Sequence, residues 1–331
     1  MKLSLVICTY MRPQSLQQLL ESVCVQTAVP DEILIIDASL KHETERLIAQ
    51  NNVTNLRYFL VSEYFRGLTK QRNFGLDQVA SNSDIVAFLD DDTELSPNYF
   101  EELIKTFAND STISGVGGIA VNENCWKLKE PDKKYDPNRY FQFEGFVYKE
   151  GQRNVVRNYL GLHSNVGPGR MPEYSHGKTC EFPLTGRIYE VDLLVGMSFA
   201  FRKRVFDSIR FSTYFEGYGL YEDADFSIRA LQFGKNIINT KVQLNHYHHP
   251  SGRPNKYQYG KMVVRNGWYV WRTKNPHPTL EHQLKWHAIT LLLTSIRFSN
   301  TLTGSTKKEA FTEAVGRTVG WWSLWFNSPK K

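Results

Sequence analysis

The sequence lacks the features that mark several large classes of protein. Its four cysteines are scattered without paired spacing: Cys8, Cys24, Cys125 and Cys180. Neither a disulfide framework nor a zinc knuckle is indicated, and a reducing compartment is expected. No stretch approaches the ~20 apolar residues that span a bilayer, and the apolar start at 1–8 is too short for a signal peptide. No basic helix or aromatic-interleaved basic repeat stands out, so nucleic acid is not an expected partner.

A glycine-rich phosphate loop is also missing. The first strand-to-helix turn, at 8–13, contains no glycine, so neither a dinucleotide fingerprint nor a P-loop is present. The glycines at 115–118 do not open a helix and are a weak signal. If this protein binds phosphates, a metal ion must carry much of their charge.

The composition is that of a globular α/β protein. The 331 residues are 41% hydrophobic and 22% charged, and the formal charge of +6 is compatible with anionic small molecules or an anionic membrane surface. Apolar runs alternate with helical patterns at 3–8, 33–36, 56–61 and 85–89. This alternation predicts a mostly parallel sheet with helices on both faces.

Polar side chains follow three of these runs. Thr9 and Asp37 end the first and second, and Asp90, Asp91 and Asp92 end the fourth. Ligands of such sheets bind at the carboxyl ends of the strands. Adjacent carboxylates repel one another, and hard divalent cations prefer oxygen ligands, so a cation site is predicted here. The alternative is a solvated acidic turn that caps the next helix.

One arginine lies on a helix face that otherwise points inward. Arg72 shares its stripe with Leu68, Gly75, Leu76 and Val79. A buried guanidinium needs an anion. A structural carboxylate and a bound phosphate are both open as its partner.

Two further clusters carry titratable groups. Glu222 and Asp223 begin a helical pattern, where acids favour the helix dipole, but one carboxylate there could also serve as a general base. His246 and His248 share one face if the chain is extended, and an imidazole could complete a metal shell begun by the aspartates. A structural role for this His-x-His is the alternative.

The combination resembles family 2 glycosyltransferases of the GT-A fold. The resemblance covers about residues 1–260, and its motifs occur in this order: Thr9-Tyr10-x-Arg12, Asp37, Gly67 with Arg72-Asn73-x-Gly75, Asp90-Asp91-Asp92, Gly196 to Arg202, and Glu222-Asp223-x-Asp225-Phe226-x-x-Arg229. Two departures concern the nucleotide base: Met11 stands where the family usually has asparagine, and the residues after Asp37 lack the usual small polar run.

The resemblance implies a role for each of these residues. The nucleotide-diphosphate sugar donor would be bound by Thr9, Tyr10, Arg12, Asp37, Arg72, Asp90, Asp91, Gly196 and Met197. Mn²⁺ or Mg²⁺ would be held by Asp92 and Asp90, with His246 or His248. Asp223, with Glu222 beside it, would be the catalytic base. One base and one displacement invert the anomeric configuration, whereas a two-carboxylate glycosidase would need no metal to neutralise a diphosphate.

The expected protein is thus an inverting, metal-dependent glycosyltransferase acting on a glycan or lipid-linked saccharide. Its nucleotide-sugar half would be 1–121, its acceptor and base half 122–260, and its helical extension 261–331. Two amphipathic helices are predicted in this extension, at about 280–298 and 307–326. It is expected in the cytoplasm, with peripheral membrane contact through the C-terminal helices. The alternatives are a sugar-nucleotide pyrophosphorylase and a non-catalytic membrane-associated scaffold.

Overall fold

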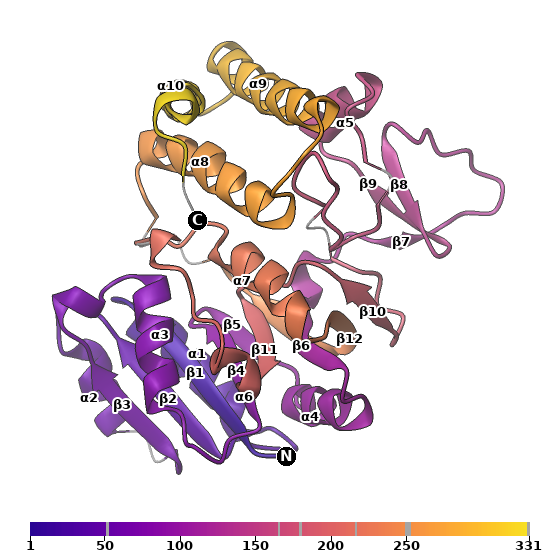
Figure 1. Ribbon diagram of the computed structural model, residues 1–331. Helices are drawn as coiled ribbons and strands as arrows, with labels where there is room; N and C mark the ends of the chain where they lie inside the picture. The colour runs from indigo at the N-terminus through magenta and orange to yellow at the C-terminus, as the bar shows by residue number, and fades with distance from the viewer. Residues whose placement is uncertain (51–52, 165, 179–180, 216, 249–252, 330–331) are drawn as a thin grey trace. The chain divides into compact units, whose positions relative to one another are not determined.

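The computed structural model describes residues 1–50, 53–164, 166–178, 181–215, 217–248 and 253–329. The chain forms two compact units, of which the first comprises Met1–Asn124 and Leu184–Gly252 and the second Cys125–Pro183 and Arg253–Lys331 (Figure 1). The predicted division of the chain after residues 121 and 260 concerns function, and it stays a prediction.

The first unit is built on a mixed sheet with the strand order β10-β12-β6-β11-β4-β1-β2-β3, and β5 pairs with β12. Within the described residues, six of its strands share one direction, while β5, β10 and β11 run against them. The strands are β1 (Leu3–Thr9), β2 (Glu32–Asp37), β3 (Leu56–Leu60), β4 (Ile85–Asp90), β5 (Thr93–Leu95), β6 (Ile113–Ala120), β10 (Ile188–Val191), β11 (Ser198–Arg202) and β12 (Lys235–His246).

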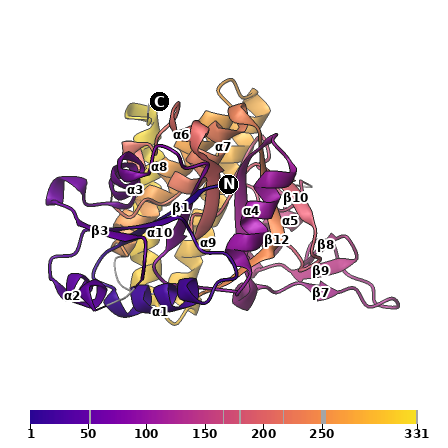
Figure 2. The ribbon, with the colours of Figure 1, turned by 90° about the horizontal axis from the view of Figure 1, so that it is seen from below.

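Helices cover both faces of this sheet, as predicted. Figure 2 shows α3 on the opposite side of β1 and β3 from α1 and α2. The apolar stripe of α1 packs in one core with the face of β1 that carries Leu5 and Ile7. On the other face, Gly75 of α3 lets the helix approach β1, because a Cβ there would lie 2.6 Å from Val6 Cγ1. The helices of this unit are α1 (Pro13–Cys24), α2 (Glu43–Ala49), α3 (Leu68–Gln78), α4 (Tyr99–Asn109), α6 (Lys203–Phe206) and α7 (Glu222–Ala230).

The strand register brings the polar strand ends to one edge. Thr9 of β1 pairs with Asp37 of β2, and Cys8 pairs with Asp90 of β4. The Asp90 amide donates to the Met197 carbonyl at 3.1 Å, which places the residue before β11 beside the end of β4. The predicted convergence of Thr9, Asp37 and Asp90 follows directly from this pairing.

The second unit combines a small antiparallel sheet with helices. The sheet has the order β7 (Lys127–Leu128), β9 (Phe146–Lys149), β8 (Tyr140–Phe143) and is followed by α5 (Gln152–Tyr159). Three long helices complete it: α8 (Lys256–Lys274), α9 (Leu280–Thr303) and α10 (Lys307–Phe326). The sequence predicted the last two but not α8, whose valines, aromatics and two interior glycines give a weak helical pattern. None of the helices in the described ranges has the length and apolar character needed to cross a bilayer.

Candidate active site

The three aspartates end β4 and point into different surroundings. Asp91 is buried, accepts a hydrogen bond from Thr9 Oγ1 at 2.7 Å and pairs with Arg12 Nη1 at 2.9 Å. Asp92 Oδ2 lies 3.6 Å from the same guanidinium nitrogen. Asp90 is only partly buried, with 36% of its side chain exposed. The triplet is therefore not a uniformly solvated turn, because two of its three members are buried.

Burial makes this concentration of negative charge unfavourable. It raises the pKa of Asp90 to about 6, with Arg72 acting against the shift and Asp92 adding to it. Burial also raises the pKa of Asp91, although Arg12 and Thr9 both lower it. A group with a raised pKa gains from a nearby positive charge. The edge of the sheet at β4 thus has the electrostatics of a cation site.

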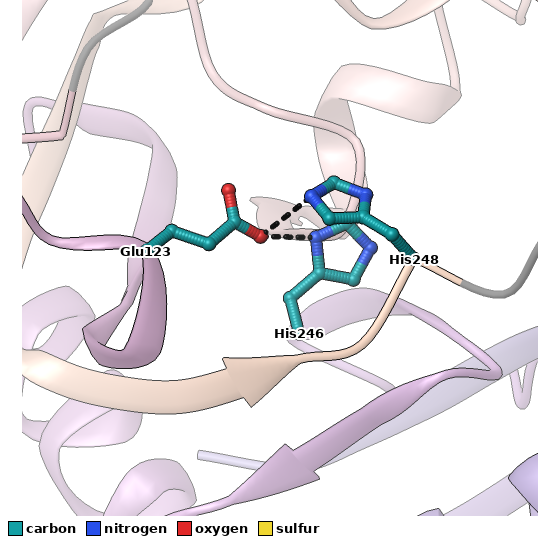
Figure 3. A group of neighbouring side chains, drawn as sticks. All are labelled: Glu123, His246 and His248. Carbon is teal, nitrogen blue, oxygen red and sulfur yellow. Dashed lines mark hydrogen bonds and ion pairs between the residues drawn. The ribbon is translucent and has the colours of Figure 1, made fainter.

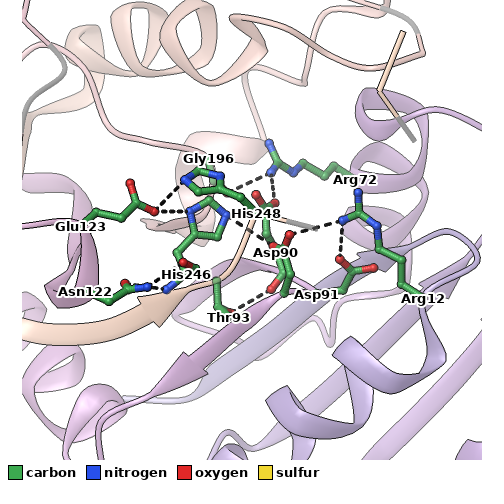
Figure 4. Close-up of polar contacts among 11 residues, drawn as sticks. Arg12, Arg72, Asp90, Asp91, Thr93, Asn122, Glu123, Gly196, His246 and His248 are labelled. Carbon is green, nitrogen blue, oxygen red and sulfur yellow. Dashed lines mark hydrogen bonds and ion pairs between the residues drawn. The ribbon is translucent and has the colours of Figure 1, made fainter. Parts of the chain in front are cut away.

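A histidine from another strand completes this group. Strand β12 pairs with β5 so that His246 lies opposite Thr93, and His246 Nε2 is 3.4 Å from Asp92 Oδ1. Potential ligand atoms of Asp90, Asp92 and His246 all lie within 4.8 Å of one another. Figure 4 shows Asp90 and His246 among the polar contacts at this edge. Two carboxylates and an imidazole form a donor set that fits a divalent ion such as Mn²⁺.

Glu123 orients this histidine, and the sequence interpretation missed it. It lies in the short helix η2 (Val121–Glu123) after β6, and one of its oxygens is 2.9 Å from both His246 Nδ1 and His248 Nε2 (Figure 3). Asn122 fixes the backbone there by donating to the His246 carbonyl at 2.8 Å and accepting from its amide at 2.9 Å. The strand-end rule can place Asn122 and Glu123 near the end of β6, but their contact with His246 depends on the pairing of β6 with β12.

The electrostatics of His246 follow from these carboxylates. Burial alone would lower its pKa, but the hydrogen bond to Asp92 and the charges of Asp90 and Glu123 raise it. His248 contacts Glu123, and its ring centroid lies 4.0 Å from that of His246. Among the predicted metal ligands, His246 is therefore grouped with the aspartates, and His248 with Glu123.

Arg72 has a carboxylate partner in the fold. Its side chain is 2% exposed, pairs through Nη1 with Glu222, and donates from Nη2 to the Gly196 carbonyl at 3.0 Å. Asp90 lies 3.5 Å away from Nη2. Burial raises the pKa of Glu222 to about 8 against the opposing pull of Arg72. The structure therefore supplies the anion that the inward position of Arg72 requires.

Asp223 is oriented by backbone amides. One carboxylate oxygen accepts from Gly196 N at 2.9 Å and the other from Ala224 N at 2.8 Å. Its neighbour Glu222 is buried with Arg72, whereas Asp223 is only partly buried. Of the two predicted catalytic acids, Asp223 is therefore the one that is partly exposed, and its role as the base stays a prediction.

Asp37 and Tyr10 lie on the β2 side of this edge. Asp37 is fully buried and accepts hydrogen bonds from Ser39 N at 2.7 Å and from the Tyr58 hydroxyl at 2.8 Å. The pKa of the Tyr58 hydroxyl is raised, first by its burial and then by its hydrogen bond to Asp37. The Tyr10 ring lies 6.0 Å from the Arg66 guanidinium carbon. The donor contacts predicted for Asp37 and Tyr10 stay predictions.

The departure at Met11 has a local consequence. Its φ of +57° lies in the left-handed region, where asparagine is enriched and methionine is uncommon. The Met11 amide donates to Ser39 Oγ at 2.7 Å, which ties this turn to the chain after β2. The turn therefore keeps its shape without asparagine.

This chain is similar in sequence to known glycosyltransferases. Residues 4–164 match the family model described as glycosyl transferase family 2. The chain is 27% identical over 209 residues to the glucosyl-dolichyl phosphate glucuronosyltransferase of Haloferax volcanii, a match that covers 57% of this chain and 64% of that protein. It is 32% identical over 131 residues to the GalNAc(5)-diNAcBac-PP-undecaprenol beta-1,3-glucosyltransferase of Campylobacter jejuni, covering 39% and 41%.

A solved structure shows the same fold. The mannosyltransferase PcManGT from Pyrobaculum calidifontis, in complex with GDP-Man and Mn²⁺, superposes with a TM-score of 0.57 at 13% identity, covering 97% of this chain and 87% of that one. This likeness confirms the predicted GT-A-type fold. The matches to the two sequence relatives span less than two thirds of their length. Residues 4–164 of this chain therefore match glycosyl transferase family 2.

Proposed function

We propose that this protein transfers a sugar from a nucleoside-diphosphate sugar to an acceptor hydroxyl, with inversion at the anomeric carbon. The observation that carries the proposal is the grouping of Asp90, Asp92 and His246 at the carboxyl end of β4, in the unit that also holds Asp223. The family match favours this reaction over the pyrophosphorylase alternative.

The residues present fit a divalent cation. Their donor atoms are two carboxylates and an imidazole, and burial raises the pKa of Asp90 although Arg72 lowers it, so the carboxylate would gain from a bound cation. Asp92, Asp90 and His246 would hold Mn²⁺ or Mg²⁺. When bound, the ion supplies positive charge for the diphosphate that leaves the sugar. Arg12 stabilises the acidic group from its other side through Asp91.

Asp223 would remove the proton from the acceptor hydroxyl. The amides of Gly196 and Ala224 fix the direction of its carboxylate, so the base is oriented before the acceptor arrives. Its neighbour Glu222 pairs with Arg72 and is not free to exchange protons with an acceptor. A single base that assists a single displacement gives a product of inverted configuration.

The acceptor we propose is a lipid-linked saccharide. The names of two relatives contain a dolichyl phosphate and a PP-undecaprenol carrier. A glycan without a lipid is the other acceptor that this chemistry allows. A lipid-linked acceptor would place the enzyme at the cytoplasmic surface of a membrane.

Transfer assays test the reaction. The full chain is incubated with Mn²⁺, each of a panel of nucleotide sugars, and polyprenyl-phosphate-linked or polyprenyl-diphosphate-linked saccharides. We expect one donor to give a glycosylated lipid whose new linkage, by NMR, has the anomeric configuration opposite to that of the donor. Retention of configuration, or release of a nucleoside triphosphate when pyrophosphate is added, would contradict the proposal.

Glu123 provides a separate prediction about the cation. A carboxylate that holds the far nitrogen of a metal-ligating histidine fixes its tautomer and orientation, and losing it reduces metal affinity by about 10–100-fold. We expect Glu123→Ala to weaken Mn²⁺ binding by about tenfold, as measured by EPR of free Mn²⁺. Glu123→Gln can still accept the hydrogen bond and should recover part of the loss.

The matched control is Glu94→Gln. Within the described ranges, Glu94 contacts Asn245 and the Tyr247 hydroxyl near the end of the same strand, and it contacts neither histidine ring. Its replacement should leave Mn²⁺ affinity within about twofold, since the metal's ligands keep their supports. Equal Mn²⁺ affinity in Glu123→Ala and wild type would contradict the role of Glu123 in orienting His246.

A further inference from the structure

Helix α9 exposes an apolar stripe along its whole length. Its large members recur at i, i+4, i+11, i+18 and i+22, which places them within about 40° of one another around the helix. They are Leu280, Leu284, Leu291, Phe298 and Leu302, exposed by 71%, 60%, 44%, 38% and 80%. Ala288 and Ser295 fill the positions between them, so the stripe contains no charge. A helix face of this kind ordinarily packs against a core.

Helix α10 continues this surface. Phe311, Val319, Trp322 and Phe326 lie on one side of it and are exposed by 52%, 38%, 56% and 87%. The two stripes adjoin, because the rings of Phe298 and Phe311 are in edge contact at 6.1 Å between centroids. Figure 1 shows α9 and α10 as neighbours in the second unit. We call these nine side chains the α9–α10 apolar surface.

The chain around this surface is strongly basic. Residues 253–331 contain 13 lysines and arginines against three acids, whereas the whole protein carries only +6. One of the three acids, Glu313, is buried between Arg297 and Arg317. Lys307 and Lys308 are exposed at the start of α10, where that helix begins beside the end of α9.

We propose that the α9–α10 apolar surface binds an anionic phospholipid membrane. An apolar helix face with tryptophan beside it, flanked by lysines, suits the boundary between headgroups and acyl chains. The basic excess favours anionic lipids. It disfavours a second copy of this chain, because two such surfaces would bring the same positive charge together. The inference extends the proposed function, because it locates the enzyme at the membrane that holds a lipid-linked acceptor. Its evidence is the α9–α10 apolar surface, which does not depend on whether the protein transfers a sugar.

Vesicle flotation tests this inference without any assay of transfer. Full-length protein is mixed with phosphatidylcholine vesicles that contain 30% phosphatidylglycerol or none. Wild type is compared with Leu284→Glu/Trp322→Glu, whose sites are exposed enough to accept charge. The matched control is Leu40→Glu in the first unit, where the leucine is 66% exposed. Thermal unfolding of each variant verifies that it is folded.

We expect wild type and the Leu40→Glu variant to bind the anionic vesicles at least about tenfold more strongly than the double variant does, and the neutral vesicles more weakly. Failure to float with anionic vesicles would overturn the inference. Equal flotation of wild type and the folded double variant would also overturn it. A third contradicting result would be that light scattering detects self-association of wild type, and that the double variant loses this self-association but still binds vesicles as wild type does. Transfer activity can be present or absent in any of these cases, so the two proposals fail separately.

Discussion

Replacing Arg72 by methionine is expected to lower the free energy of unfolding by about 3–5 kcal/mol, the range found when one partner of a buried ion pair is removed. Arg72 is 2% exposed and its guanidinium contacts both Glu222 and the Gly196 carbonyl. Three aromatic rings surround it, those of Phe88, Phe199 and Phe211. Without the guanidinium, Glu222 keeps either an unpaired charge or a proton in a site that water does not reach. Urea unfolding at neutral pH measures the loss.

The double variant Arg72→Met/Glu222→Leu provides the control for this result. It removes both charges and fills the volume with apolar atoms, so most of the lost stability should return. If Arg72 serves mainly to bind a donor phosphate, the single variant should instead unfold near the wild-type urea concentration and lose nucleotide affinity. That outcome would contradict the structural assignment of Arg72 to Glu222.

Replacing Asp223 by asparagine is expected to reduce kcat by about 10²–10⁴-fold while nucleotide-sugar affinity stays within a few-fold of wild type. The carboxylate accepts hydrogen bonds from the amides of Gly196 and Ala224, and asparagine keeps only one of these acceptors. We therefore expect a loss of stability near 1 kcal/mol, which cannot account for the loss of turnover. Steady-state transfer, donor titration and thermal unfolding measure the three quantities.

Asp225→Asn is the matched control from the same helical turn. Asp225 is fully buried and pairs with Arg229 at 2.6 Å. Its replacement should lower the melting temperature more than Asp223→Asn does, with kcat reduced only a few-fold. Near-normal turnover of the Asp223→Asn enzyme would remove Asp223 as the base.

The strand ends were predictable because they depend on a local pattern. Apolar runs ended by Thr9, Asp37 and Asp90 are visible in the sequence, and parallel strands bring their carboxyl ends to one edge. The inward position of Arg72 was equally visible, since it follows from helical spacing. The identity of its partner was not, because Glu222 is 150 residues away and comes near only through the packing of α7.

The parts that were missed depend on long-range pairing. Glu123 reaches His246 because β6 and β12 are neighbours in the sheet. The pairing of these two strands cannot be predicted from the sequence alone. Helix α8 was missed because its two interior glycines weaken the helical pattern in the sequence. In the fold, close packing against a neighbouring helix makes a glycine favourable there. At the contact of α8 with α10, a Cβ on Gly260 would lie 2.2 Å from the Glu313 carbonyl oxygen, so tertiary packing explains a residue that local propensity disfavours.

The central claim is that the edge of the sheet at Asp90, Asp92 and His246 binds a nucleoside diphosphate together with a divalent cation. Thermal unfolding against a panel of nucleoside diphosphates, with and without Mn²⁺, tests it in wild type and Asp92→Asn. A ligand at 100 times its Kd stabilises the folded state by about 2.7 kcal/mol. We expect one diphosphate to stabilise wild type in Mn²⁺, and we expect this shift to be lost without the ion and in Asp92→Asn. Equal stabilisation with and without Mn²⁺, or in the variant, would contradict it.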